Sequence, residues 1–505
     1  MTAVREVRAL SIVGTGAMGR GIAQIAAAAG LEVWLYDSRP GAAEEARDFV
    51  AAMLGRLVEK GKMTAQALAA ASGRMRVAGS LADLARADVV IEAIVEDLET
   101  KRALFRELEN IFPDVVLATN TSSLSVTAIA AGCRRPERIA GFHFFNPVPL
   151  MKLVEVIGGG LTDPSVLDLL CALARRLGHQ PVRAADTPGF LVNHAGRGYG
   201  TEALRILGEG IAEPVDIDRI LREAAGFRMG PFELLDLTGL DVSHPVMESI
   251  YEQYYQEPRY RPSPIARNRV AAGLIGKKVG RGFYDYKGGN QVAPQESPAP
   301  TQRPESVWIG ETDERSRSAL VAVARAAKVA LEDTPRPSKA ALCLVAPLGE
   351  DTTAAAVAQD LDPTRAVAVD TFLGLERRRT LMTTPVTAPS TIAAAHGLLA
   401  ADGTPVTVIR DSPGFVAQRV LANIVNIACD IAQQRIATPA DIDRAVTLGL
   451  AYPQGPLAWG DALGPARVLS ILEALLRLYG DPRYRPSPWL RRRAALGVSL
   501  LTPEN

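Results

Sequence analysis

The sequence predicts four folded parts: a doubly wound α/β domain, an all-α domain, a degenerate α/β module and a second copy of the all-α domain. Strand and helix patterns alternate up to about residue 184, and a helical pattern begins at residue 185. The octapeptide DTPGFLVN at 186–193 recurs as DSPGFVAQ at 411–418. At roughly 100–200 residues per domain, the chain is long enough for this number of parts.

The N-terminal part begins with a βαβ unit. Residues 8–13 form an apolar run that ends in a Gly-Thr-Gly turn, residues 20–29 have helical composition, and residues 31–36 form a second β-rich run. Further elements are expected as strands at 87–94, 115–122 and 138–145, and as a helix at 99–112. This alternation favours a parallel, doubly wound sheet.

The all-α domain is duplicated. Aligning position 186 with position 411 also aligns Asp216 with Asp441, Asp218 with Asp443, and Gly230-Pro231 with Gly455-Pro456. EPRYRPSP at 257–264 matches DPRYRPSP at 481–488, and a match over this length indicates an internal repeat. The copies differ where chemistry is expected, because Gln418 replaces Asn193.

Two stretches separate the copies. Residues 287–305 are rich in Pro, Gln and Gly, which predicts a linker. Residues 306–408 contain strand-like runs but no GxGxxG, which predicts a degenerate α/β module with a structural role. The expected boundaries are 1–184, 185–286, 287–305, 306–408 and 409–496.

Composition excludes several classes of protein. Lys plus Arg equal Asp plus Glu at 56 each, so we expect no nucleic-acid partner. No window approaches about 18 consecutive apolar residues, so we expect no membrane span. The four cysteines lack CxxC spacing, which favours a reducing compartment without a disulfide framework or metal site. With no signal-peptide pattern at the N-terminus, we expect a cytoplasmic protein.

The first glycine turn carries a dinucleotide motif. Gly14-Thr15-Gly16-Ala17-Met18-Gly19 fits GxGxxG, follows a strand and opens a helix. Asp37 ends the next strand, where a carboxylate accepts hydrogen bonds from the adenosine ribose and repels a 2′-phosphate. The pattern therefore favours NAD over NADP, although Arg39 weakens this preference and the motif alone leaves FAD open.

A candidate catalytic pair lies in residues 139–156. His143 ends an apolar run, and Glu155 lies in the strand-like segment MKLVEV, where a carboxylate is costly unless it is paired. A carboxylate bound to a histidine nitrogen fixes the tautomer and raises the basicity of the ring. The other histidines (His179, His194, His244 and His396) have no comparable context.

Four motifs together resemble the L-3-hydroxyacyl-CoA dehydrogenase family. They are VGTGAMG, NTSSL at 120–124, FHFFNPVPLMKLVEV at 142–156 and DTPGFLVN at 186–193. The resemblance covers about residues 5–285, and the helical domain alone recurs near the end. It implies a Rossmann-type NAD-binding domain and the oxidation of a 3-hydroxyacyl-CoA to the 3-oxoacyl-CoA with NAD.

The resemblance also implies roles for individual residues. His143 becomes the base and Glu155 its partner, while Ser122 and Asn193 bind the reacting 3-oxygen. Residues implied at the cofactor are Gly14, Gly16, Ala17, Met18, Gly19, Asp37, Glu96, Lys101, Asn120, Asn146 and Lys278. Asn146 also resembles a substrate contact, as does Lys60, although Met53 replaces the serine that neighbours this lysine in the family. Ser122 as a helix N-cap and Asn193 as a helix cap or bridge stay open.

The chain length further implies a subfamily. A chain of this length with a duplicated helical domain resembles the long dehydrogenases of bacterial phenylacetate catabolism, which act on 3-hydroxyadipyl-CoA. The alternative is 3-hydroxybutyryl-CoA. An adipyl group needs a cation for its distal carboxylate, and Arg197 and Arg228 are candidates by sequence position.

Other classes of protein stay open at this point. These are a non-catalytic NAD-binding scaffold and a dehydrogenase of a free hydroxy acid. The family's dimer interface predicts a homo-oligomer through the helical domains, or a second helical copy that mimics the partner subunit.

Overall fold

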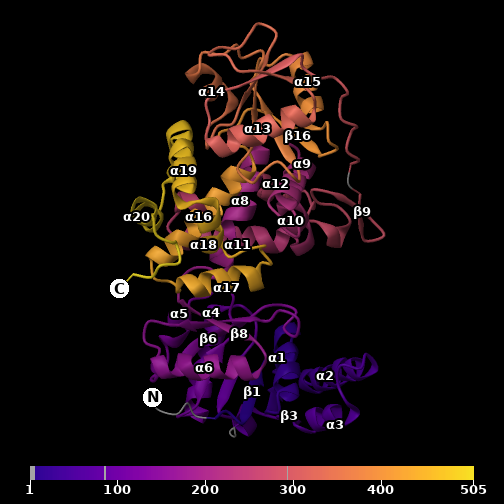
Figure 1. Ribbon diagram of the computed structural model, residues 1–505. Helices are drawn as coiled ribbons and strands as arrows, with labels where there is room; N and C mark the ends of the chain where they lie inside the picture. The colour runs from indigo at the N-terminus through magenta and orange to yellow at the C-terminus, as the bar shows by residue number, and fades with distance from the viewer. Residues whose placement is uncertain (1–5, 85–86, 293, 505) are drawn as a thin grey trace. The chain divides into compact units, whose positions relative to one another are not determined.

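The computed structural model describes residues 6–84, 87–292 and 294–504. The chain forms two compact units (Figure 1). Unit 1 contains residues 1–194 and 434–450, and unit 2 contains residues 195–433 and 451–505. Within the described ranges, no helix is both long enough and apolar enough to cross a membrane.

Unit 1 is built on sheet A, whose strands follow the order β3-β2-β1-β4-β5-β6-β7-β8. The strands are β1 (Ala9–Val13), β2 (Glu32–Tyr36), β3 (Met75–Val77), β4 (Val89–Glu92), β5 (Val116–Thr119), β6 (Ile139–Phe144), β7 (Leu153–Gly158) and β8 (Gln180–Ala185). All neighbouring pairs are parallel except β6 and β7, which are antiparallel. The expectation of an α/β domain is confirmed, but its sheet is mixed.

Apolar side chains on both faces of sheet A are covered. Along β4, Val89 and Ile91 join the core beneath α1 and α6, whereas Val90 joins a second core with Phe105 of α4 and Ile129 of α5. This alternation on one strand is what a doubly wound sheet requires. The helices of unit 1 are α1 (Ala17–Ala28), α2 (Ala42–Glu59), α3 (Ala65–Gly73), α4 (Leu98–Ile111), α5 (Val126–Ala130), α6 (Pro164–Arg176) and α17 (Pro439–Gly449).

The helical repeat is visible in the helix boundaries. After α7 (Val192–Ala195), the first copy contains α8 (Arg197–Gly208), α9 (Pro214–Arg219), α10 (Pro231–Thr238), α11 (Leu240–Gln253) and α12 (Pro264–Ala271). The second copy contains α16 (Ala417–Gln433), α17, α18 (Pro456–Leu463), α19 (Pro465–Tyr479) and α20 (Pro488–Leu496). Counterparts such as Pro231 and Pro456 begin equivalent helices, each with a proline at the first turn where its missing N–H costs nothing.

Each helical copy contributes one segment to an α/β sheet edge. In unit 1, the N–H of Ala185, at the end of β8, donates to the carbonyl of Ile436 at 2.8 Å. In unit 2, the N–H of Arg410 donates to the carbonyl of Ile211 at 3.0 Å. The two bonds join equivalent positions of the repeat. The second helical copy therefore completes the N-terminal unit with its residues 434–450.

Residues 306–409 of unit 2 form sheet C, in the order β12-β11-β13-β14-β15-β16. Its strands are β11 (Ser306–Ile309), β12 (Ala330–Glu332), β13 (Leu342–Val345), β14 (Ala366–Val369), β15 (Arg379–Thr383) and β16 (Val406–Ile409), with helices α13 (Glu314–Ala326), α14 (Thr352–Ala358) and α15 (Pro389–Leu399). β14 and β15 are antiparallel and β15 and β16 are parallel, which repeats the pattern of β6, β7 and β8. The degenerate module therefore keeps the later strands of the N-terminal sheet.

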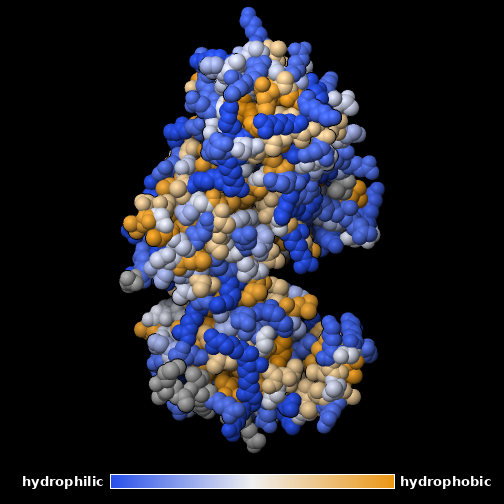
Figure 2. Space-filling model, in the orientation of Figure 1, coloured by the Kyte–Doolittle hydropathy of each residue, from blue (hydrophilic) through white to orange (hydrophobic). Residues whose placement is uncertain are grey.

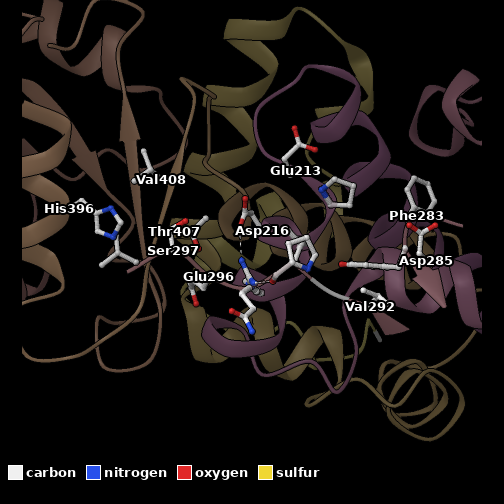
Figure 3. Close-up of a pocket in the computed structure, with 17 residues that line it drawn as sticks. Glu213, Asp216, Phe283, Asp285, Val292, Glu296, Ser297, His396, Thr407 and Val408 are labelled. Carbon is white, nitrogen blue, oxygen red and sulfur yellow. Dashed lines mark hydrogen bonds and ion pairs between the residues drawn. The ribbon is translucent and has the colours of Figure 1, made fainter. Parts of the chain in front are cut away.

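The linker is held in place by specific contacts. Its start is a hairpin of β9 (Asp285–Lys287) and β10 (Asn290–Val292), which the sequence did not predict. Farther along, Glu296 pairs with the buried Arg378 at 2.6 Å, and Arg219 donates to the carbonyl of Pro294. Around these residues is a cavity of about 600 Å³, into which Glu296, Ser297 and His396 come from the linker and α15 (Figure 3). It contains none of the predicted site residues.

Surface polarity agrees with the balanced composition. Hydrophilic and hydrophobic residues are intermixed on the visible face of each unit in Figure 2.

Candidate active site

Seven of the predicted site residues line one cavity of about 330 Å³ in unit 1. It lies where β4, β5 and β6 end, the side on which parallel α/β sheets bind ligands. Its lining residues are Met18, Ala93, Ile94, Glu96, Asn120, Ser122, His143, Phe144, Phe145, Asn146 and Asn193. The cavity is large enough for a small reacting group and lies inside the usual range for ligand sites.

His143 and Glu155 form a buried pair. They lie opposite each other on the antiparallel strands β6 and β7, and Nδ1 of His143 is 2.6 Å from Oε2 of Glu155. The two residues are 5% and 1% exposed. A carboxylate only accepts, so Nδ1 carries the proton and Nε2 keeps its lone pair.

The second oxygen of Glu155 holds the segment that leads to Asn193. Oε1 accepts from the backbone N–H groups of Leu191 and Val192, at 3.0 and 2.8 Å. Phe190 has a left-handed φ of 46°, which turns the chain sharply between β8 and α7. The same carboxylate therefore positions both His143 and the segment carrying Asn193. The sequence pattern did not predict this second role.

The glycine turn has the shape of a dinucleotide cradle. A Cβ at Gly14 would lie 2.5 Å from the carbonyl oxygen of Ala93, and one at Gly19 would lie 1.9 Å from that of Gly14. No atom lies within 4 Å of a Cβ placed on Gly16, so the backbone there is open to a ligand. Gly16 also precedes the first turn of α1, whose N-terminus favours a pyrophosphate.

Asp37 is ionised and fixed at the end of β2. Burial raises the pKa of Asp37, but hydrogen bonds from Thr15 and Arg39 outweigh burial and lower it. Oδ2 accepts from both the N–H and the hydroxyl of Thr15 at 2.8 Å. Arg39 forms an ion pair with Glu45 at 2.6 Å, which directs its guanidinium to that side chain.

Glu96 organises the loop after β5. Its Oε1 accepts from the hydroxyl of Thr121 at 2.7 Å, from the N–H of Ser122 at 2.8 Å and from the N–H of Ser123 at 3.0 Å. Burial raises the pKa of Glu96, but these bonds and the charge of Lys101 lower it overall. The hydroxyl of Ser122 also reaches this oxygen, at 3.2 Å. The helix N-cap is Ser125 and not Ser122, so Ser122 does not cap α5.

Lys101 lies beneath this loop and not on the cavity surface. Its side chain is 1% exposed, and Nζ lies 2.5 Å from Glu92 and 3.3 Å from Glu96. Glu92 is fully buried and also accepts from the hydroxyl of Thr119 at 2.7 Å. In this structure Lys101 therefore reaches the cavity only through Glu96. Sequence reasoning missed Glu92, although an acid at the end of the apolar strand VVIE is the same signal that identified Glu155.

The remaining predicted residues have separate environments. Asn120 lines the cavity and accepts from the N–H of Phe144 at 2.9 Å, and Asn146 is exposed at the end of β6. Lys60 is exposed at the end of α2 and is not among the residues that line the cavity. Lys278 lies in unit 2, where its ammonium is 2.5 Å from Asp241.

The second α/β module has lost the histidine. At the offset that aligns Asn193 with Gln418, Ala368 of β14 takes the place of His143, and Asp370 directly follows β14. Nε2 of Gln418 donates to Asp370 at 2.9 Å, and its Oε1 accepts from the N–H of Gly349 at 2.8 Å. These polar groups satisfy one another in the interior, so the module keeps the architecture of the site without its base.

Comparison with known proteins identifies the family. The model described as "3-hydroxyacyl-CoA dehydrogenase, NAD binding domain" matches residues 9–187. The model of the C-terminal domain of the same family matches twice, at residues 189–286 and 414–499. The chain belongs to the 3-hydroxyacyl-CoA dehydrogenase family. It is an NAD-dependent oxidoreductase that oxidises 3-hydroxyacyl-CoA thioesters.

Some relatives of this dehydrogenase match nearly the whole chain, and others match only about its N-terminal half. It is 40% identical to the 3-hydroxyadipyl-CoA dehydrogenase of Escherichia coli K12, over 97% of this chain and 98% of that protein. A probable 3-hydroxybutyryl-CoA dehydrogenase of Bacillus subtilis is 42% identical over 56% of this chain and 98% of its own length. A crystal structure of 3-hydroxybutyryl-CoA dehydrogenase from E. coli K12 has a TM-score of 0.86 and 39% identity, covering 97% of this chain and 99% of that one.

The geometry of the glycine turn fits NAD. The bare backbone at Gly16 leaves room for the pyrophosphate, and the ionised Asp37 is placed for the ribose hydroxyls. Across the described residues, no group of three or more His, Cys, Asp or Glu side chains is arranged to hold a metal ion.

Proposed function

We propose that His143 is the general base of this dehydrogenase and that Glu155 is its positioning partner. The observation that carries the proposal is the buried contact of 2.6 Å between Nδ1 of His143 and Oε2 of Glu155, which leaves Nε2 as the proton acceptor. Nε2 takes the proton of the 3-hydroxyl, and Glu155 stabilises the imidazolium that forms. In the reverse direction the imidazolium returns the proton.

Ser122 and Asn193 are proposed to bind the reacting oxygen. Both line the cavity with His143, and a hydroxyl and an amide are suitable donors to an oxygen that becomes a carbonyl. NAD, when bound, supplies the acceptor for the hydride that leaves carbon 3. Asn120 and Asn146, at the ends of β5 and β6, are proposed to contact the nicotinamide end of the cofactor, and Asn146 also the substrate.

The other cofactor contacts are proposed at the glycine turn and around Glu96. Gly14, Gly16, Ala17, Met18 and Gly19 would hold the pyrophosphate, and Asp37 the adenosine ribose. Glu96 is proposed as a direct contact and Lys101 as the residue that positions it. Direct roles for Lys278 at the cofactor and for Lys60 at coenzyme A stay predictions.

The proposed substrate is 3-hydroxyadipyl-CoA. The support is the E. coli relative that bears this activity in its name, which matches 97% of this chain and 98% of its own length. The alternative is 3-hydroxybutyryl-CoA, the substrate in the name of the protein whose crystal structure matches over the full length. A role in phenylacetate degradation and a cytoplasmic location stay predictions.

The test is turnover with purified protein. The expected result is NADH consumption with 3-oxoadipyl-CoA that exceeds consumption with acetoacetyl-CoA and disappears in His143→Ala. Normal NADH binding without turnover of either thioester would favour the non-catalytic scaffold. A protein that only binds NAD does not need a buried carboxylate bonded to Nδ1 of the histidine. The contact of Glu155 with His143 therefore argues against the scaffold.

The second helical copy is proposed to replace a partner subunit. Its residues 434–450 belong to the N-terminal unit and bind the end of β8 through Ile436. Truncation at about residue 290 should therefore leave that edge uncovered and lower activity. A truncated chain that remains fully active would contradict this role, and gel filtration of both forms would report whether a homo-oligomer forms.

A further inference from the structure

The carboxylate of Asp186 lies between the two segments that carry the proposed ligands of the 3-oxygen. Asp186 directly follows β8 and begins the segment that leads to Asn193. Its oxygens face the start of α5, the helix that follows the loop carrying Ser122. All of these residues belong to unit 1. The motif DTPGFLVN begins with this aspartate, but neither the base nor the proposed cofactor contacts account for it.

Three hydrogen bonds attach this carboxylate to the start of α5. Oδ2 of Asp186 accepts from the hydroxyl of Ser125 and from the N–H of Thr127, both at 2.7 Å. Oδ1 accepts from the N–H of Val126 at 3.1 Å. Ser125 in turn caps α5, because its hydroxyl oxygen accepts from the N–H of Ala128 at 3.1 Å. Since a charged acceptor forms stronger bonds than a neutral one and is favoured at a helix N-terminus, this junction is held firmly.

Two other carboxylates hold the far ends of the same segments. Glu96 accepts from the N–H of Ser122 at 2.8 Å, three residues before the helix cap. Glu155 accepts from the N–H groups of the two residues before Asn193, at 3.0 and 2.8 Å. Asp186 bonds directly from one segment to the other. The separation of the two segments therefore depends on its carboxylate.

We infer that Asp186 is a positioning residue of the dehydrogenase, which holds Ser122 and Asn193 at the separation that the reacting oxygen requires. The inference rests on the proposed function, because Asp186 acts only through these two ligands. Two donors stabilise the developing charge on one oxygen only when both lie within hydrogen-bond distance of it. A misplacement of about 1 Å can cost about 100-fold in rate. Asp186 can therefore control kcat although it is not among the residues that line the cavity.

The second α/β module contains the same contacts without the catalytic histidine. Asp411, the counterpart of Asp186 in the repeat, accepts from the N–H of Thr352 at 2.8 Å and from the N–H of Thr353 at 3.2 Å. These threonines are the first two residues of α14, as the donors to Asp186 include the first two residues of α5. The segment after Asp411 leads to Gln418, which replaces the asparagine. The contacts thus belong to the fold of both modules, and Asp411 provides a matched control for their effect on stability.

The test compares Asp186→Asn with Asp411→Asn in the full-length chain. Asparagine keeps the size of the side chain, but its amide nitrogen donates where a carboxylate oxygen accepts, so bonds to the helix start are lost. In Asp186→Asn, kcat for reduction of the better 3-oxoacyl-CoA substrate should fall by about 10- to 100-fold. The Kd for NADH, measured by fluorescence titration, should stay at the wild-type value. Asp411→Asn should keep the wild-type kcat, and both variants should unfold at similarly lowered temperatures.

A deuterium isotope effect separates positioning from folding. With NADH dideuterated at C4 of the nicotinamide, the isotope effect on kcat in Asp186→Asn should equal or exceed that of the wild type, because displaced oxygen ligands slow the chemical step. A wild-type kcat in Asp186→Asn, equal losses of kcat in the two variants, or a smaller isotope effect would overturn the inference alone. Absence of wild-type turnover with either thioester would overturn the proposed function, and the inference with it.

Discussion

Glu155 uses one carboxylate oxygen for Nδ1 of His143, at 2.6 Å, and the other for the backbone of residues 191 and 192. In Glu155→Gln, the amide oxygen can still accept from the backbone, but the amide nitrogen then faces His143 and donates. The proton moves to Nε2, and the base is lost. We expect kcat to fall by about 10²- to 10⁴-fold with NADH binding retained.

Steady-state kinetics and NADH fluorescence titration would check this prediction. Glu109→Gln is the matched control, because Glu109 is also a buried carboxylate that accepts from two backbone N–H groups, those of Arg134 and Arg135. It is not among the residues that line the cavity. Equal losses in the two variants would mean that Glu155 has only a structural role.

Lys101→Met tests whether the buried lysine acts through Glu96. Loss of the ammonium frees Glu96 from its 3.3 Å ion pair, so the loop that carries Ser122 should lose its fixed position. We expect the Kd for NAD to rise by about 10-fold or more. Because Glu92 would remain as an unpaired buried charge, the double variant Glu92→Gln/Lys101→Met is needed to restore stability without restoring affinity.

Isothermal titration with NAD on both variants would separate the two effects. Lys62→Met, a change at an exposed lysine of the same unit, provides the baseline. A normal Kd in the double variant would show that Lys101 does not position the cofactor site.

The sequence predicts local patterns well and long-range arrangement less well. The βαβ unit, the glycine turn and the pairing of His143 with Glu155 could be predicted because spacing and apolar context carry that information. The direction of β7 could not, since parallel and antiparallel strands share the same two-residue periodicity. The burial of Lys101 was also missed, because a lysine on an amphipathic helix is normally exposed.

The assignment of α17 to unit 1 illustrates a second limit. Its residues look like any helix of the repeat, but tertiary contacts place it in unit 1, among them the bond between Ala185 and Ile436 and the packing of Gly449 against Leu153. The repeat itself could be predicted, because similar motifs recur at nearly the same offset along the chain. Tertiary packing decides which helical copy covers which sheet, and a local sequence pattern does not predict that packing.

The two helical copies meet around a buried ion pair whose stability should depend on pH. In unit 2, Nε of Arg419 on α16 lies 2.8 Å from Oε1 of Glu202 on α8, and both side chains are fully buried. Burial raises the pKa of Glu202, but the charges of Arg483 and Arg419 and the hydroxyl of Tyr484 lower it overall. The stability that Glu202 contributes is thus present above its ordinary pKa of 4.5 and is lost as the pH falls below that value.

Glu202→Gln should remove this acid-dependent part of the free energy of unfolding. Arg419→Met leaves the buried Glu202 with only its longer contact to Arg483, at 3.5 Å, and the hydroxyl of Tyr484, so we expect a loss of up to about 3–5 kcal/mol at neutral pH. Urea unfolding from pH 7 down to about pH 2 would measure both effects, because the loss falls below the ordinary pKa of 4.5, with Arg491→Met as a control at an exposed pair. A wild-type pH dependence in Glu202→Gln would show that other carboxyls control acid unfolding.

The last prediction links the C-terminal copy to the active site through Gly449. A Cβ on this final residue of α17 would lie 2.9 Å from Leu153 and 3.1 Å from Val192, whose N–H is bound by Glu155. Gly449→Val should therefore displace Val192 and, with it, the neighbouring Asn193. We expect kcat to fall by about 10- to 100-fold, since displacements near 1 Å are enough for such losses, together with a destabilisation of about 1–3 kcal/mol.

Gly55→Val controls for the substitution itself, because a Cβ on Gly55 in α2 meets no atom within 4 Å. Kinetics and thermal unfolding of the two variants would distinguish a local effect at the site from general destabilisation. If Gly449→Val keeps the wild-type kcat, the packing of α17 against Val192 does not control the position of Asn193. The second helical copy would then contribute stability to the N-terminal unit without shaping its chemistry.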